Sequence, residues 1–314
     1  MTTYILRRLA LMLPVAVMVT IIVFVLIRLT PGDPALAYLG EEASPESVVA
    51  FRHQLGLDQP LPVQYLVYLG NLLHGNLGFS IKSHEPVLQA IIDRFPATLE
   101  LGFASLVFAL AVALPAGIIS AVRKDSATGL VAGALPLFGV SLPNFFLGIL
   151  LILVFGLYLR LLPPGGFTSF PDDPLDNLRH LVLPAISLGT VNAAISLRLM
   201  RSSLLETLAQ DYVRTARAKG LAARRVLTRH ALRNALIPVA TVVGIQVGLV
   251  LEGAFVTETI FAWPGIGRLA VNGIFQRDYP VVQGAVLFAA LVFMFASLLV
   301  DILYVYLDPR ISYS

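Results

Sequence analysis

The chain contains no cysteine, which excludes disulfide frameworks, cysteine-based metal sites and thiol catalysis. Charged residues are also scarce, since Asp, Glu, Lys and Arg make up 13% of the 314 residues. Soluble domains carry roughly 25%. Apolar residues make up 57% and the mean hydropathy is +0.82, a balance typical of an integral membrane protein. The net charge of +3 is small, so we interpret it as topology information and expect no nucleic-acid partner.

Local signatures of catalysis are missing as well. The dipeptide Gly-Lys, which a phosphate-binding loop requires, never occurs. His84-Glu85 is followed by Pro86 and lacks the second histidine of a zinc-binding helix. No Gly-x-Ser-x-Gly turn presents a nucleophilic serine. We therefore expect no enzyme activity, no catalytic residue and no metal site in this chain.

Long apolar runs dominate the sequence, and six of them are long enough to cross a membrane. They cover about residues 9–29, 98–122, 129–159, 181–204, 235–256 and 281–307. Helices are expected, because unpaired backbone amides are too costly in lipid for open strands. The run at 129–159 contains Pro136 and Pro143, which predict a tilt or kink. The predicted fold class is therefore all-α, a polytopic membrane protein with six transmembrane helices in one membrane domain over 1–314.

The first run resembles a secretory signal, because Arg7-Arg8 precedes it and Ala35-Leu36-Ala37 looks like a cleavage site. A signal has an apolar core of about 7–15 residues. This run reaches about 19 residues, close to the ~20 that a crossing needs. We interpret it as an uncleaved first span.

The positions of Lys and Arg predict the orientation, since positive residues tend to stay on the cytoplasmic side. With both termini cytoplasmic, 14 of the 22 Lys and Arg residues fall inside, including Arg123, Lys124 and the cluster from Arg198 to Arg233. Acidic residues such as Asp172 and Asp173 then lie outside. Residues 30–96 become an extracytoplasmic helical insertion, and 257–283 a turn-rich cap packed against protein.

The most informative segment is the basic connector at 205–235, between two apolar runs. Residues 211–219 predict a short helix that Gly220 ends in a left-handed turn. A second helix from about Ala222 places Arg225, Arg229 and Arg233 on one face. Anionic lipid headgroups alone could explain these charges. The small residues Ala216, Ala218 and Gly220 favour close approach of a partner, which lipid contact does not require.

The connector closely resembles the cytoplasmic loop of bacterial ABC importer permeases of the dipeptide, oligopeptide and nickel group. The resemblance rests on Tyr212-Val-Arg-Thr-Ala-Arg-Ala-Lys-Gly-Leu221 and His230-Ala-Leu-Arg-Asn-Ala-Leu-Ile-Pro238. It continues through Pro31-Gly-Asp-Pro34, Gly56-Leu-Asp58, Ala97-Thr-Leu-Glu-Leu101, Leu183-Pro184, Arg201-Ser-Ser203, Glu258-Thr-Ile-Phe261, Trp263-Pro-Gly265, Arg277-Asp-Tyr-Pro-Val-Val-Gln283 and Asp308-Pro-Arg310.

The resemblance implies a type I ABC importer permease in a bacterial cytoplasmic (inner) membrane. Its partners would be a second permease subunit, two cytoplasmic ATP-binding subunits and an extracytoplasmic substrate-binding protein. ATP and Mg would bind the ATPase subunits, so no cofactor is expected in this chain. The general loop pattern of this superfamily has Glu-Ala-Ala, three residues and Gly, of which only Ala216 and Gly220 match here. The residues implied to couple to the ATPases are Thr215, Ala216, Arg217, Lys219, Gly220 and Arg225.

Polar residues within the spans are candidates for the translocation path, because they are costly in lipid and often face a cavity. The candidates are Asn192, Gln246 and Glu252, and hydrogen bonding between helices is an equally good explanation for the two amides. Asp301 in the last span fits better as the partner of a loop arginine. Gly244 and Gly248 permit close helix packing, either within the subunit or against another.

Three functions remain open from the sequence. The first is ATP-driven import of peptides, with glutathione or nickel complexes as alternative substrates. The second is an ion-coupled secondary transporter, which would need intramembrane acids that are sparse here. The third is a membrane scaffold without transport. Uptake that depends on ATPase subunits, on an ion gradient or on neither would separate them.

Overall fold

The structure is a computed structural model that describes residues 2–29, 34–40, 43–54 and 56–307. Within these ranges the chain is helical and contains no strand, only an isolated bridge between Phe79 and Pro86. The motif residues 31–33 and 308–310 lie outside the described part. The helices are α1 (Thr2–Leu29), α2 (Pro34–Leu39), α3 (Pro45–Gln54), α4 (Leu61–Leu73), α5 (Val87–Val122), α6 (Ala127–Ser141), α7 (Asn144–Leu151), the π-helix η1 (Ile152–Tyr158), α8 (Pro174–Leu208), α9 (Asp211–Ala218), α10 (Ala223–Arg225), the π-helix η2 (Val226–Ala231), α11 (Leu232–Ile260), α12 (Ile266–Gln276) and α13 (Tyr279–Leu307).

Five of the described helices are long and apolar enough to cross a membrane. They contain five of the predicted spans, and the all-α membrane fold is confirmed. The run at 129–159 differs, because it is broken into α6 and the α7–η1 segment. Leu142 is extended (φ −104°, ψ 129°) and Pro143 follows, so the expected kink is a full interruption. Neither piece counts as a spanning helix by length, and the number six and the side of each terminus stay predictions.

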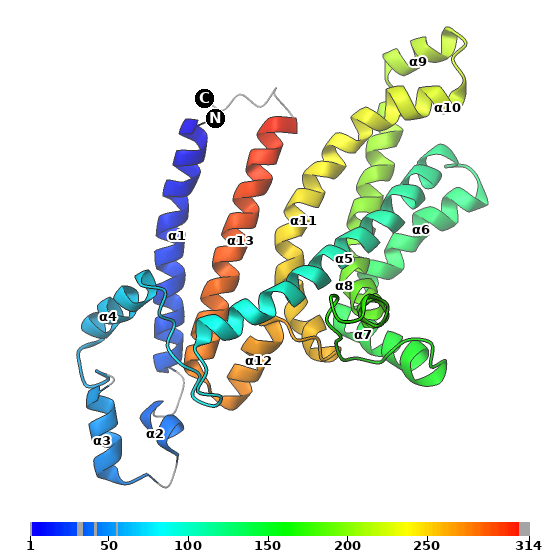
Figure 1. The fold of residues 1–314 in the computed structure, drawn as a ribbon. Coiled ribbons are helices and arrows are strands. Elements are labelled where there is room, and N and C mark those ends of the chain that lie inside the picture. Colours follow the sequence, from blue (N-terminus) through cyan, green and yellow to red (C-terminus); the bar gives the residue numbers. More distant parts are fainter. Residues whose placement is uncertain (1, 30–33, 41–42, 55, 308–314) are drawn as a thin grey trace. The chain divides into compact units, whose positions relative to one another are not determined.

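The described residues form two compact units, one made of 1–97 with 264–295 and the other of 98–263 with 296–314. In the first unit, the 30–96 insertion is helical as predicted and contains α2, α3, α4 and the first turns of α5, which begins before the predicted boundary (Figure 1). Asp278 is buried there and accepts hydrogen bonds from the Ser80 hydroxyl and from the backbone N–H groups of Ile81 (3.1 Å) and Lys82 (3.3 Å). The carboxylate of the Arg277-Asp-Tyr-Pro motif therefore holds a loop in place.

The second unit is a helical bundle of α6, α7, α8, α11 and most of α5 (Figure 1). Glycines permit the close approaches within it. A Cβ on Gly189 of α8 would lie 2.5 Å from the Ser105 carbonyl oxygen of α5, and one on Gly244 of α11 would lie 2.7 Å from Val300 of α13. Gly244 thus serves packing within the subunit, one of its two predicted uses.

The turn after α11 is buried, as predicted for the start of 257–283. Trp263 has no exposed surface, and its ring meets that of Phe167 edge to face with centroids 4.8 Å apart. The Gly166 N–H donates to the Phe261 carbonyl at 2.8 Å. Beyond this turn the predicted cap is mostly helical, since α12 and the start of α13 occupy it.

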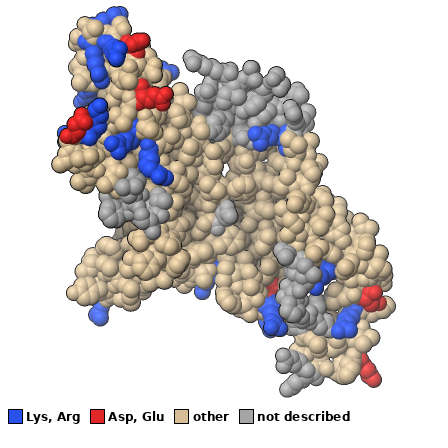
Figure 2. All heavy atoms as spheres, turned by 180° about the vertical axis from the view of Figure 1, so that it is seen from behind, with Lys and Arg blue, Asp and Glu red and all other residues tan. Residues whose placement is uncertain are grey.

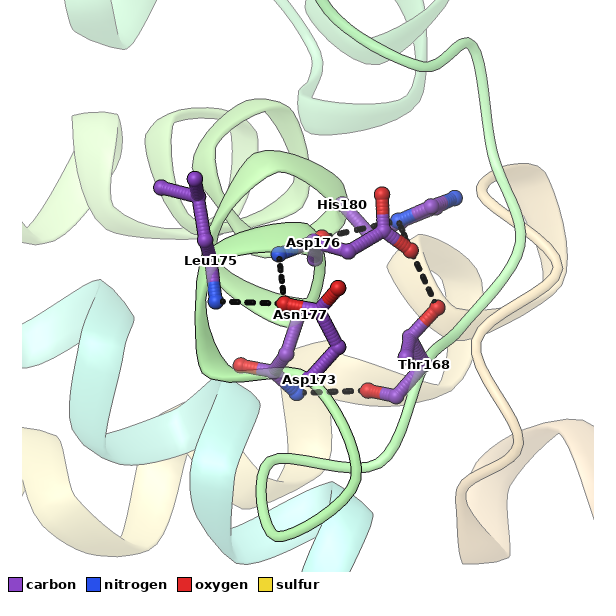
Figure 3. A network of polar contacts seen from close by, with 6 residues as sticks. All are labelled: Thr168, Asp173, Leu175, Asp176, Asn177 and His180. Atoms are coloured by element: carbon purple, nitrogen blue, oxygen red, sulfur yellow. Dashed lines mark hydrogen bonds and ion pairs between the residues drawn. The ribbon is translucent and has the colours of Figure 1, made fainter.

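α8 joins two chemically different ends of this unit. Its 35 residues correspond to about 52 Å at 1.5 Å per residue, well beyond a ~30 Å hydrocarbon core. At its N-terminus Asp173 caps the helix by accepting from the N–H groups of Leu175 and Asp176, both at 3.1 Å (Figure 3). Thr168 donates to the Asp176 carboxylate at 2.5 Å, and Asn177 donates to the Thr168 carbonyl at 2.8 Å. The acidic start of α8 and the basic connector after it are therefore far enough apart for the predicted placement on opposite sides of a membrane.

Candidate functional site

The basic connector forms a helical hairpin at the end of α8 and α11 (Figure 1). Its first arm, α9, is amphipathic: Val213 and Ala216 are buried, while the other six residues are exposed. Asp211 lies in the first turn and Arg217 in the last, so both charges are favourable to the helix dipole. Arg214 pairs with Asp211 at 3.5 Å. The exposed face of α9 therefore carries a net positive charge.

Gly220 ends α9 in the predicted left-handed turn, with φ +76°. The Gly220 N–H donates to the Arg217 carbonyl at 2.9 Å, and the Leu221 N–H donates to the Ala216 carbonyl at 3.4 Å. These two bonds are those of a Schellman motif, and Leu221 adds the apolar contact that usually accompanies it. No atom lies within 4 Å of the position a Cβ on Gly220 would take, so glycine is required here by the backbone and not by internal crowding.

The second arm differs from the regular helix that its spacing predicts. α10 is one turn long and continues into the π-helix η2, which leads directly into α11. Val226, Ala231 and Ala235 are buried, so the buried positions are five and then four residues apart. Arg225, Arg229 and Arg233 are all exposed. π turns occur often at functional sites, and this one lies at the junction of hairpin and span.

The hairpin is held together by its own apolar cluster. Val213 and Ala216 of α9 pack with Val226 of η2, and Leu208 and Leu221 cover the group. Ala216 is 6% exposed. The structure thus corrects the reason inferred for a small residue at this position: its methyl group faces the interior of the hairpin and not an outside partner.

The base of the hairpin is tied to three long helices. A second buried cluster contains Ala121 of α5, Met200 and Leu204 of α8, Ala231 of η2, and Ala235 and Val239 of α11. Ser203 donates to the Ala235 carbonyl at 3.0 Å. The hairpin and these three helices therefore share one packed cluster.

The charge of the hairpin is concentrated on its surface. Figure 2 shows Lys and Arg side chains gathered over the end that carries α9 and α10, above a largely uncharged band. Arg217, Lys219 and Arg225 are all exposed, as is Thr215, whose hydroxyl donates to the Asp211 carbonyl at 3.0 Å. The predicted coupling residues are therefore brought together on one hairpin, with Ala216 alone facing inward.

Gln246 and Asn192 connect α11 and α8 inside the bundle. Gln246 is 2% exposed; its Oε1 accepts from the Ser196 hydroxyl at 3.1 Å and its Nε2 donates to the Asn192 carbonyl at 3.1 Å. Asn192 is also buried, and its Nδ2 lies 3.5 Å from the Leu188 carbonyl of its own helix. For Gln246 the geometry therefore supports interhelical bonding, whereas the Asn192 side chain contacts its own helix.

Two family models match most of the chain. Residues 113–313 match the family model of the binding-protein-dependent transport system inner membrane component. Residues 1–102 match the model of the N-terminal part of such membrane components. The chain belongs to this family. It is a permease of an ABC importer and an inner membrane protein, one subunit of a larger transport system.

Among curated proteins, the permease is similar to three named transport subunits along the full length of each chain. It is 44% identical to the dipeptide transport system permease protein DppB of Escherichia coli (strain K12), over 100% of this chain and 99% of that protein. It is 45% identical to the di/tripeptide transport system permease protein DppB of Pseudomonas aeruginosa, with the same coverage. It is 42% identical to the dipeptide transport system permease protein DppB of Alkalihalophilus pseudofirmus, over 100% of both chains.

Two buried polar residues of the permease, Ser196 and Glu258, were not among the site residues predicted from the sequence. Ser196 completes the Asn192–Gln246 contact, and its position one helical turn after Asn192 is the only sequence signal for it. Glu258 has no exposed surface and accepts from Thr98 at 2.7 Å, so the Glu-Thr-Ile-Phe motif places a carboxylate inside the bundle. The side chains of Glu252 and Asp301 lie outside the described residues.

Proposed function

We propose that the permease forms part of the translocation pathway for dipeptides and related short peptides, which an extracytoplasmic binding protein delivers. The three relatives above carry peptide names, and their similarity extends over the whole of this chain. A second permease subunit would complete the pathway. Glutathione and nickel complexes are the alternative cargoes within the same group.

The hairpin is the part of the permease that we propose as the docking site of the cytoplasmic ATPase subunits. The observation that carries this is its construction: apolar residues hold α9 to η2 internally, and the outer face exposes Thr215, Arg217, Lys219 and Gly220. A preformed, rigid helical hairpin suits insertion into a groove on a partner. Anionic headgroups could attract the same charges without needing this geometry.

Coupling follows from the way the hairpin is anchored. We propose that α8 and α11 move together, because Gln246 joins them in the bundle and the cluster around Met200 and Ala231 joins them at the hairpin. ATP acts on the spans only through a difference in affinity for two arrangements of this element. In this proposal the permease contributes no catalytic residue and binds no cofactor, and the ATPase subunits bind ATP and Mg.

Uptake in proteoliposomes tests this function. We expect labelled dipeptide to accumulate only when the permease is reconstituted with its partner permease, both ATPase subunits, the binding protein and ATP. Glutathione and a nickel complex, each offered separately, identify the cargo by the same assay. Uptake without ATPase subunits, or driven by an ion gradient alone, would overturn the proposal in favour of a secondary transporter.

A further inference from the structure

α4 follows the first span along the chain, and it carries no charged residue over Leu61–Leu73. No residue of this described helix is fully buried. Exposed apolar residues recur at helical spacing along α4 and form one face of the helix. The exposed members are Val63 (42%), Leu66 (65%), Val67 (59%) and Leu73 (81%).

The opposite face of α4 is fastened to α1. The Tyr65 hydroxyl is 2.9 Å from the Thr20 hydroxyl, and the Tyr65 ring meets Phe24 edge to face with centroids 5.3 Å apart. Arg28 donates to the Gln64 side-chain oxygen through Nε at 3.0 Å and Nη2 at 2.7 Å. Thr20, Phe24 and Arg28 lie on successive turns along one side of α1, so the contact with α4 extends along the α1 axis.

These contacts set the depth of α4. The apolar run of α1 extends from Leu9 to Ile27, which corresponds to about 28 Å, close to a ~30 Å hydrocarbon core. Thr20 lies seven residues before Ile27, which is about 10 Å along the helix. The Tyr65 level of α4 is therefore below the boundary of the hydrocarbon region.

At that depth α1 also exposes apolar side chains. Leu13, Val17 and Ile21 of α1 are exposed in the same way and belong to a span. Tyr side chains are common at the membrane interface, where one end is apolar and the other polar. Arg28 directly follows the apolar run, where a long cationic side chain can reach the headgroup layer.

We propose that α4 lies within the leaflet at the C-terminal end of α1, with Val63, Leu66, Val67 and Leu73 in contact with lipid acyl chains. On the predicted orientation this is the outer leaflet. The occupant of this face is thus lipid and not the binding protein or another subunit. Apolar helices of this kind bind membranes through the area that they bury in the interface. The insertion would then be anchored to the membrane at a point separate from the spans.

Accessibility of spin labels to oxygen and to a nickel chelate tests this placement. The chain has no cysteine, so Leu66→Cys and Val67→Cys each offer one labelling site before assembly with the partner subunits in nanodiscs. We expect both labels to collide with oxygen far more than with the water-soluble chelate. Leu13→Cys on α1 is the lipid reference, and Val49→Cys on α3, 64% exposed, is the water reference.

The two labels should group with Leu13→Cys and not with Val49→Cys. Collision with the chelate at the level of Val49→Cys would place the face in water. Low collision with both reagents would place it against another protein. Either result overturns the proposal, and neither measurement depends on which cargo the importer carries.

Discussion

Replacing Gly220 by tryptophan is expected to reduce ATP-driven uptake to background, a loss of at least about a hundredfold, or ~2.7 kcal/mol. Gly220 adopts φ +76°, where a side chain costs roughly 1–2 kcal/mol. Nothing in the chain lies within 4 Å of the added Cβ, so the indole would project from the hairpin into the space proposed for the ATPase. The measurement is peptide uptake in proteoliposomes, together with the amount of permease inserted.

Gly75 supplies a matched control for this substitution. It has φ +73°, is exposed and likewise has nothing within 4 Å of a Cβ. Gly75→Trp introduces the same strain and the same indole after α4, away from the hairpin, and should keep uptake within about twofold, below ~0.5 kcal/mol. Equal losses in the two variants would show that backbone strain, and not docking, explains the effect at Gly220.

Replacing Gly189 by valine is expected to prevent α5 and α8 from packing. The new Cβ would lie 2.5 Å from the Ser105 carbonyl oxygen and 2.9 Å from the Phe108 ring. A backbone carbonyl cannot rotate away as a side chain can, so the helices must separate. Overpacking of this kind costs about 1–3 kcal/mol and sometimes more. We expect most of the protein to be lost from the monodisperse peak in size-exclusion chromatography, with a lowered midpoint of thermal unfolding.

Gly253→Val separates this effect from helix propensity. Gly253 lies inside α11, and its Cβ would meet only the Leu188 Cδ1 atom, at 3.1 Å. That methyl group ends a flexible side chain, while the propensity change is the same in both helices. Gly253→Val should therefore keep the monodisperse peak. Similar behaviour of the two variants would contradict the close approach of α5 and α8.

Features encoded locally were the ones that the sequence predicted well. Gly220 ends a helix because only glycine adopts its backbone angle easily, and this signal needs no tertiary contact. The long spans were predicted by composition, because lipid demands apolar side chains over a fixed length. The Leu142–Pro143 interruption was expected only as a kink, because a proline in the sequence does not show whether the helix bends or ends there.

Features set by tertiary packing were predicted poorly. Ala216 could have faced a partner or the interior, and only the position of Val226 across the hairpin decides this. The π-helix η2 shifts the buried positions from four to five residues apart, which a regular helical pattern cannot show. Gln246 and Asn192 were recognised as polar residues in the spans, but the hydrogen bond from Ser196 to Gln246 depends on how α8 meets α11.

Binding of the ATPase subunits to a charge-reversed hairpin tests the central claim most directly. The variant is Arg217→Glu with Lys219→Glu, and its control is Arg123→Glu with Lys124→Glu on the exposed connector between α5 and α6, which changes the net charge by the same amount. In nanodiscs we expect the hairpin variant to bind the ATPase subunits at least about tenfold more weakly, or ~1.4 kcal/mol, with the control near wild type. Unchanged binding by the hairpin variant, or equal weakening by the control, would contradict the account.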